Sequence, residues 1–180
     1  GLMDGRDYQL QRAGGAQARA RALDTPASAA VILNPPWNFV ARERGARSLG
    51  STMELFGPYQ ANGPFVRRAW AQSNASALER YLAAYIEGCR AAQDPARREL
   101  TLRVLARELQ TDARTAEMTY RELTRPGSGL ARDCAFDHAG FRNVLSLRAE
   151  ILGQWGGKPP APEKYVDLQY FERARRHAGP

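Results

Sequence analysis

The residues best suited to bind a ligand lie in Ala29–Phe39, which reads AAVILNPPWNF. A short apolar run ends there at Asn34, and two prolines, Trp37 and Asn38 follow. Pro36 is a favourable first helical residue, so the amides of Trp37 and Asn38 would carry the partial positive charge of a helix N-terminus. The side chains add an amide and an aromatic wall. We therefore expect Asn34, Trp37 and Asn38 to bind a small ligand with an anionic or polar group; a rigid helix start with Trp37 in the core is the alternative.

A second candidate for backbone contact is the pair Gly14 and Gly15, which separates a predicted strand from a predicted helix. Glycine has no side chain, so a ligand can approach the backbone amides closely. Two glycines also form simple tight turns, and both interpretations stay open.

Nucleophilic and metal chemistry have less support. Cys134 and His138 are four residues apart and could form a Cys–His pair, but no third residue orients them. Two cysteines and two histidines without ligand spacing argue against a metal site, and we expect no cofactor. A Cys89–Cys134 disulfide would close a loop of about 45 residues, worth roughly 4 kcal/mol. Free thiols are the favoured interpretation, because Cys89 lies on an apolar helical face.

Alternating strands and helices are the elements that would position the Asn34 corner. Strands are predicted at residues 7–13, 29–33, 47–51 and 64–68, and helices at residues 16–23 and 36–44. The run 29–33 has the length and flanks of a buried parallel strand. Ligands of open α/β sheets bind at the carboxyl ends of strands, and the corner follows this strand directly.

After residue 68 the pattern is almost entirely helical. Ser76 and Glu79 match a capping box for a helix that reaches Ala92. Its predicted apolar face comprises Leu78, Leu82, Tyr85, Ile86 and Cys89. Asp94, then Thr111 or Asp112, then Asp137 are the expected caps of three further helices. A short amphipathic helix ends the chain.

Composition and charge bound the class of protein. The 180 residues are 43% hydrophobic and 25% charged, which is typical of a globular chain. The net charge is +7, but the basic residues are spread along the chain and mixed with acidic ones, so we expect no nucleic-acid partner. No apolar run approaches the ~20 residues of a membrane helix. The opening GLMDGRDYQL does not have the pattern of a signal peptide.

Four stretches and the tail carry a resemblance to a known family. They are GRDYQLQRAGGAQARARAL, AAVILNPPWNFVARERGARSLG, LFGPYQANGPFVRRAWAQSN, ALERYLAAYIEGCRAA and PEKYVDLQYFERA. Their order and spacing resemble the second half of ABC-transporter solute-binding proteins of the nitrate, sulfonate and taurine type. This family also includes proteins that bind thiamine pyrimidine precursors.

The resemblance implies an α/β fold of the type II periplasmic-binding-protein class, with two lobes and a ligand cleft between them. The chain would be an incomplete, C-terminal half of that fold and helix-rich after residue 68. Residues 1–56 would be the remaining part of lobe two, 57–64 the crossover or hinge, and 65–180 the return to lobe one, with a closing helix.

The resemblance also implies roles for the crossover loop. Tyr59 and Gln60 would face the ligand from a strand beneath the cleft, and an ordinary surface loop is the alternative. Gly57 and Gly63 would be the hinge points for lobe closure. The implied protein is not an enzyme; it is periplasmic or exported and captures a small organic solute, anionic or aromatic, for an ABC permease in the membrane. Another chain could complete its sheet.

Two other classes of function stay open. Enzymes with this fold exist, a pyrimidine synthase and a desulfinase among them. LysR-type transcription factors use the same architecture for their effector lobe, but a helix-turn-helix region before residue 1 would be needed, and none is visible.

Overall fold

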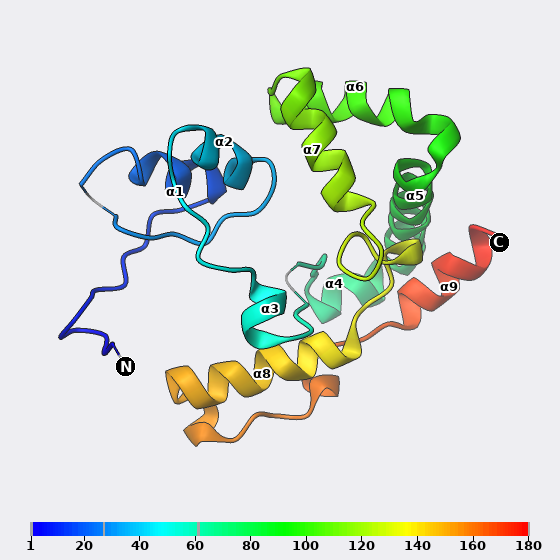
Figure 1. Ribbon diagram of the computed structural model, residues 1–180. Helices are drawn as coiled ribbons and strands as arrows, with labels where there is room; N and C mark the ends of the chain where they lie inside the picture. The colour runs from blue at the N-terminus through cyan, green and yellow to red at the C-terminus, as the bar shows by residue number, and fades with distance from the viewer. Residues whose placement is uncertain (1, 27, 61, 180) are drawn as a thin grey trace. The chain divides into compact units, whose positions relative to one another are not determined.

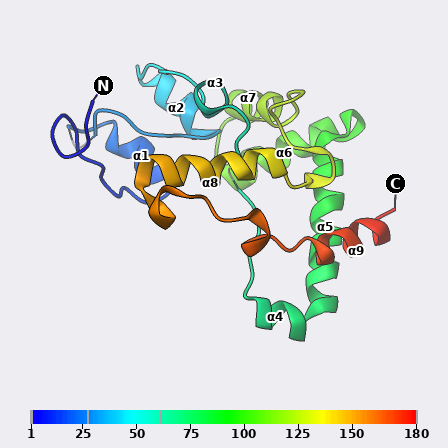
Figure 2. The same ribbon diagram turned by 90° about the horizontal axis from the view of Figure 1, so that it is seen from below.

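The computed structural model describes residues 2–26, 28–60 and 62–179, and its regular elements are helices (Figures 1 and 2). In chain order the α-helices are α1 (Ala16–Ala22), α2 (Trp37–Glu43), α3 (Thr52–Phe56), α4 (Arg68–Ser73), α5 (Ala75–Gln93), α6 (Arg98–Leu109), α7 (Ala113–Leu123), α8 (His138–Leu152) and α9 (Gln169–His177). Short 3-10 turns are η1 (Pro95–Arg97), η2 (Arg132–Cys134), η3 (Gln154–Gly157) and η4 (Pro162–Lys164).

The predicted α/β fold is wrong. Within the described residues no sheet forms, and the one bridge is an isolated parallel pair, Asp4 and Tyr8. The four segments expected as strands are irregular, apart from the bridge residue Tyr8 and from Arg68, which begins α4. In the supposedly buried run 29–33, Ile32 is 67% exposed. A strand needs a neighbour for its backbone hydrogen bonds, and in the described ranges none of these segments is paired in a sheet. The predicted two-lobe fold with a cleft between α/β lobes is therefore wrong as well.

The chain divides into two compact units. Unit 1 comprises Gly1–Ser48 and Leu102–Arg121, and unit 2 comprises Leu49–Thr101 and Glu122–Pro180. The division into 1–56, 57–64 and 65–180 stays a prediction, and Ala61 of the crossover lies outside the described residues.

Unit 1 contains the two N-terminal helices that the sequence predicts. α1 packs against α2, with Ala20, Phe39 and Ala41 buried. Arg44 at the end of α2 forms an ion pair of 2.5 Å with Asp24, which follows α1. Both helices begin and end within two residues of their predicted bounds, because glycines and prolines mark their ends.

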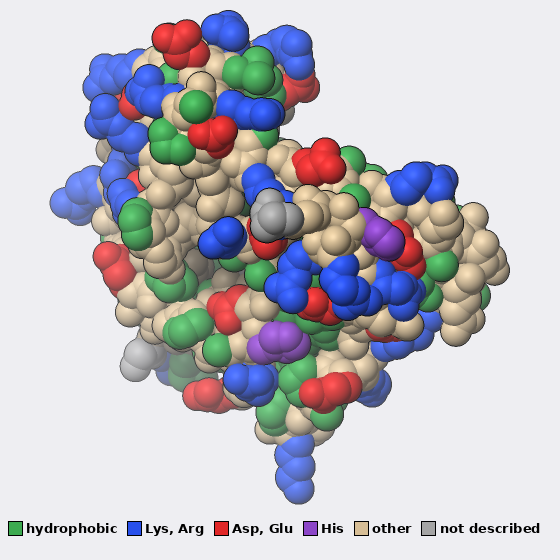
Figure 3. Space-filling model, turned by 90° about the vertical axis from the view of Figure 1, so that its right-hand side faces the viewer, with side chains coloured by type: hydrophobic (Ala, Val, Ile, Leu, Met, Phe, Trp, Pro, Cys, Tyr) green, Lys and Arg blue, Asp and Glu red, His purple; other side chains and the backbone are tan. Residues whose placement is uncertain are grey.

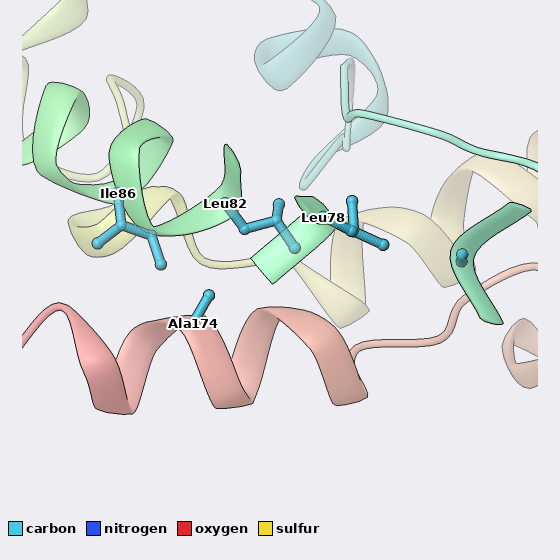
Figure 4. Close-up of a cluster of buried hydrophobic side chains, with 5 residues drawn as sticks. Leu78, Leu82, Ile86 and Ala174 are labelled. Atoms are coloured by element: carbon cyan, nitrogen blue, oxygen red, sulfur yellow. The ribbon is translucent and has the colours of Figure 1, made fainter. Parts of the chain in front are cut away.

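Unit 2 is built on the packing of α5 against α9, which lie side by side in both views (Figures 1 and 2). Leu78, Leu82 and Ile86 lie along one face of α5, and Leu82 and Ile86 point toward α9, where Ala174 faces them (Figure 4). Leu78 and Leu82 are 8% and 7% exposed, and Ile86 and Ala174 are fully buried. The small Ala174 side chain lets the two helices approach closely. The buried face of α5 confirms most of the predicted apolar periodicity.

Two details of α5 differ from the prediction. Asn74 is the N-cap, and Glu79 does not close a capping box; its carboxylate pairs with Arg173 of α9 at 2.6 Å. Tyr85 is 42% exposed and stacks on Tyr81. Glu79, which its spacing assigned to a capping box, thus pairs instead with Arg173 of α9.

The later helix starts follow their local signals. The side chain of Asp94 accepts from the Ala96 amide at 2.9 Å, that of Asp112 from Thr115 at 2.7 Å, and that of Asp137 from Gly140 at 2.9 Å. These caps confirm the predicted boundaries of η1–α6, α7 and α8. A further capping box, Ser51 with Glu54, starts α3, and the sequence analysis missed its S-x-x-E signal.

Candidate functional site

A disulfide joins two segments of unit 2 that are 45 residues apart in the sequence. Cys89 lies on the buried face of α5, and Cys134 ends the turn η2; their Cα atoms are 6.1 Å apart. The favoured interpretation of free thiols is therefore wrong. Local patterns indicated only that Cys89 is buried, whereas the return of the chain to α5 at η2 brings Cys134 against it.

An ion pair lies directly beside this disulfide. Arg90 follows Cys89, and Asp133 precedes Cys134; the Arg90 Nε atom donates to Asp133 Oδ1 at 2.7 Å. Both side chains are mostly buried, at 26% and 17% exposure. A second donor of Arg90, Nη1, reaches the Ala178 carbonyl at 3.0 Å. Arg90 therefore connects α5, η2 and the end of α9.

The electrostatics of Asp133 follow from this geometry. The hydrogen bond from Arg90 holds the pKa of Asp133 below its usual value, and the charges of Arg132 and Arg175 lower it further. The same bond raises the pKa of Arg90. Asp133 is therefore a carboxylate at neutral pH, and its charge is already engaged.

The backbone of η2 is unusual at two consecutive residues. Asp133 and Cys134 have φ angles of 57° and 53°. This left-handed region is uncommon for residues other than glycine; it costs Cys134 about 1–2 kcal/mol, and aspartate tolerates it better. The disulfide and the ion pair hold both residues in place against that cost.

Four arginines surround this feature, and we call them the arginine cluster: Arg90 of α5, Arg132 of η2, and Arg175 and Arg176 of α9. Together with Asp133 and Gly179 they line a shallow cavity of about 270 Å³. Lys and Arg side chains gather near the middle of the face shown in Figure 3, with a few acidic side chains among them.

The charges of the arginine cluster are only partly balanced. Arg90 pairs with Asp133, and Arg175 pairs with Glu172 at 2.7 Å. Within the described part of the chain, neither Arg132 nor Arg176 makes a side-chain hydrogen bond or close ion pair. Cations in the last turn of α9 also stabilise its dipole. That role does not explain Arg132, which comes from another element.

The Asn34 corner forms local hydrogen bonds at the start of α2. The Trp37 and Asn38 amides donate to the Asn34 carbonyl at 3.0 and 3.4 Å, so neither is directed at a ligand. Trp37 lines a second cavity of about 200 Å³, with Gln17, Glu108, Leu109 and Gln110. The Asn38 Oδ1 atom is buried without a hydrogen-bond partner in the described structure. A ligand role for this corner stays a prediction.

The remaining predicted residues have structural contacts. Gly14 has a φ of 81° and Gly15 is the N-cap of α1, which fits a tight turn. In the crossover, Gln60 accepts from the Asp137 amide at 2.9 Å and donates to the Asn62 carbonyl. Gln60 thus connects the crossover to the start of α8.

Three more residues of the crossover were assigned from the resemblance. Tyr59 is half-buried, Gly57 ends α3 with a φ of 76°, and Gly63 is exposed. The side chain of Asn143 in α8 donates to the carbonyls of Phe56 and Pro58, on either side of Gly57. The loop is therefore anchored to α8, and ligand contact and hinge motion stay predictions.

The Cys134–His138 pair has no free thiol in this structure, because Cys134 is bonded to Cys89. The ring of His138 packs edge-on against Phe136, with centroids 5.3 Å apart. No group of three His, Cys, Asp or Glu residues suited to a metal is found in residues 2–26, 28–60 and 62–179. Across the same residues, every helix is too short or too polar to span a membrane.

The chain matches no family model, no curated protein and no solved structure. The arginine cluster was also missed by sequence reasoning. Its signals are the dipeptides Cys89-Arg90 and Asp133-Cys134 and the basic run that ends in Arg175-Arg176. In a chain rich in arginine, these signals are not distinctive until the fold brings them together.

Proposed function

We propose that this protein binds a small anionic solute at the arginine cluster and that it works outside the cytoplasm. One observation supports the binding role above all others: arginines from three separate elements line one cavity that contains a single carboxylate. That carboxylate, Asp133, is already paired with Arg90. The cluster therefore has an excess of positive charge that a bound anion would neutralise.

The chemistry of the guanidinium group suggests the class of solute. Its planar array of donors binds carboxylate, sulfonate or phosphate oxygens two at a time. A cavity of about 270 Å³ suits a small ion rather than a large cofactor. Nucleic acid is a poorer fit, because other exposed arginines pair with nearby acids, such as Arg121 with Glu117 and Arg125 with Glu122.

The disulfide supports the proposed location. Structural disulfides persist in oxidising compartments and are rare in the cytosol. An exported or periplasmic protein is consistent with the Cys89–Cys134 bond. Delivery of the solute to an ABC permease rests on the family resemblance alone and stays a prediction.

Isothermal titration calorimetry with inorganic phosphate, sulfate and methanesulfonate tests the binding role. The variant with Arg132→Gln and Arg176→Gln should bind at least about tenfold more weakly, because each lost charge-assisted hydrogen bond is worth roughly 1.5–3 kcal/mol. The matched control, Arg67→Gln with Arg142→Gln, removes two exposed arginines of unit 2 from outside the cluster. Its affinity should stay within about twofold, since screened surface charges contribute little.

Two results would overturn the proposal. One is that none of the three anions binds with a Kd below about 10 mM, which corresponds to a binding free energy of roughly −3 kcal/mol. The other is an equal loss of affinity in both double variants, which would point to net charge rather than to the cluster.

A further inference from the structure

We propose that the Cys89–Cys134 disulfide controls anion binding at the arginine cluster, so that reduction by a dithiol weakens binding. The inference rests on the proposed function and adds a regulatory device to the same site. The disulfide and the cavity are adjacent in the sequence as well as in space. Arg90 follows Cys89, and Asp133 precedes Cys134. Arg132 is two residues from the same bond.

The disulfide is the strongest restraint on η2. Apart from it, the side-chain hydrogen bonds that join η2 and its N-cap to α5 among the described residues are that of the Arg90–Asp133 pair and a long one of 3.4 Å from Gln93 to the Ala131 carbonyl. Asp133 and Cys134 would both gain by leaving the left-handed region. Once the bond is broken, η2 is therefore free to relax away from α5.

Relaxation of η2 would remove one wall of the cavity and leave the other. Arg132 and Asp133 would move with η2. Arg175 and Arg176 would stay in place, because α9 is held to α5 by the packing around Ala174 and by the Glu79–Arg173 pair. The net charge of the cluster would stay the same, because one positive and one negative side chain leave together, but fewer guanidinium donors would converge on one anion. The reduced protein would therefore bind the anion more weakly.

The exchange reaction balances with a dithiol as reductant. One thiolate of the reagent attacks the sulfur of Cys134, which is less buried than Cys89, and forms a mixed disulfide. Cys89 leaves as a thiolate and takes up a proton. The second thiol of the reagent, as its thiolate, then attacks the mixed disulfide and releases Cys134 as a thiolate, which is protonated. Two electrons pass to the protein, and the reagent becomes a cyclic disulfide.

Thermodynamic linkage makes the coupling measurable from both sides. If reduction weakens phosphate binding by a given factor, saturating phosphate must oppose reduction by the same factor. We expect a factor of about ten, which corresponds to a reduction potential about 30 mV more negative in saturating phosphate.

The first test compares phosphate binding by the oxidised protein and by the protein reduced with dithiothreitol and freed of reagent without air. Affinity should fall about tenfold on reduction. The variant with Cys89→Ala and Cys134→Ala should bind like the reduced protein and should not respond to dithiothreitol. Equal affinity of the oxidised and reduced forms would overturn this inference and leave the proposed function intact.

A second measurement needs no variant. The equilibrium of wild-type Cys89–Cys134 with dithiothreitol is followed with saturating phosphate and with sodium chloride of equal ionic strength. A shift toward the disulfide in phosphate supports the coupling, and no difference from sodium chloride refutes it, even if the double variant does not fold. Failure of the oxidised protein to bind any anion would instead overturn both the proposed function and this inference.

Discussion

Loss of the Cys89–Cys134 disulfide should strongly destabilise unit 2. The bond closes a loop with a sequence separation of 45 residues. In the chain-entropy treatment, a loop of this length lowers the free energy of the folded state relative to the unfolded state by about 4 kcal/mol at 25 °C. The perturbation is the double variant Cys89→Ala with Cys134→Ala, or reduction of the wild type.

The net effect should be smaller than the loop entropy. When the bond is absent, Cys134 is free to leave the left-handed region and recovers about 1–2 kcal/mol, whereas aspartate tolerates that region better, so Asp133 recovers less. We therefore expect the free energy of unfolding to fall by about 2–3 kcal/mol. The change in loop entropy acts on the unfolded state, so the helix content of the folded protein should stay the same.

Urea unfolding followed by circular dichroism measures this loss. Reduced wild type lacks the bond but keeps both sulfur atoms, whereas the double variant lacks both. Comparing the two separates the effect of the bond from that of sulfur packing. The double variant treated with reductant is the control, and its midpoint should not move. A free energy of unfolding that is unchanged on reduction, or two titratable thiols in the oxidised native protein, would refute the reasoning.

Three further predictions concern the packing, capping and acid stability of the fold. Ile86→Ala should cost about 2–5 kcal/mol and Ile86→Val about 0.5–1.5, because Ile86 is fully buried against α9; equal urea midpoints for the two variants would contradict this packing. Asp137→Ala should cost about 0.5–2 kcal/mol by removing the cap of α8, with Asp137→Asn retaining most of the stability in thermal melts. The hydrogen bond from Arg90 lowers the folded-state pKa of Asp133 below its ordinary value of 3.8. The ionised Asp133 side chain therefore stabilises the folded protein fully above its unfolded-state pKa, and this contribution is lost as the pH falls through the folded-state pKa. Acid titration of native circular dichroism should show this loss below about pH 4, and a wild-type profile identical to that of Asp133→Asn would argue against it.

Helices were predictable from the sequence because their signals are local. Asp94, Asp112 and Asp137 accept hydrogen bonds from amides two or three residues away, so spacing alone identifies them. The apolar face of α5 follows from a fixed helical period, and Ile86 lies on it as expected. Glu79 was misassigned because its partner, Arg173, is 94 residues away.

Strands were not predictable in the same way. The run 29–33 has the composition of a buried strand, but composition cannot supply the neighbour that a strand requires. In the structure Ile32 is exposed instead. The inferred ligand corner depended on that strand, and in the structure its Trp37 and Asn38 amides bond to the Asn34 carbonyl; a ligand role there stays a prediction.

The sequence by itself determined where most helices begin and end, because caps and apolar periods act within a few residues. Only the tertiary structure decided which side chains meet. Cys89 and Cys134 are 45 residues apart, and the ion pair beside them spans 43. Arg175 and Arg176 complete the cluster from the last helix. Contacts of this kind depend on how the chain returns to α5, and no local spacing encodes that path.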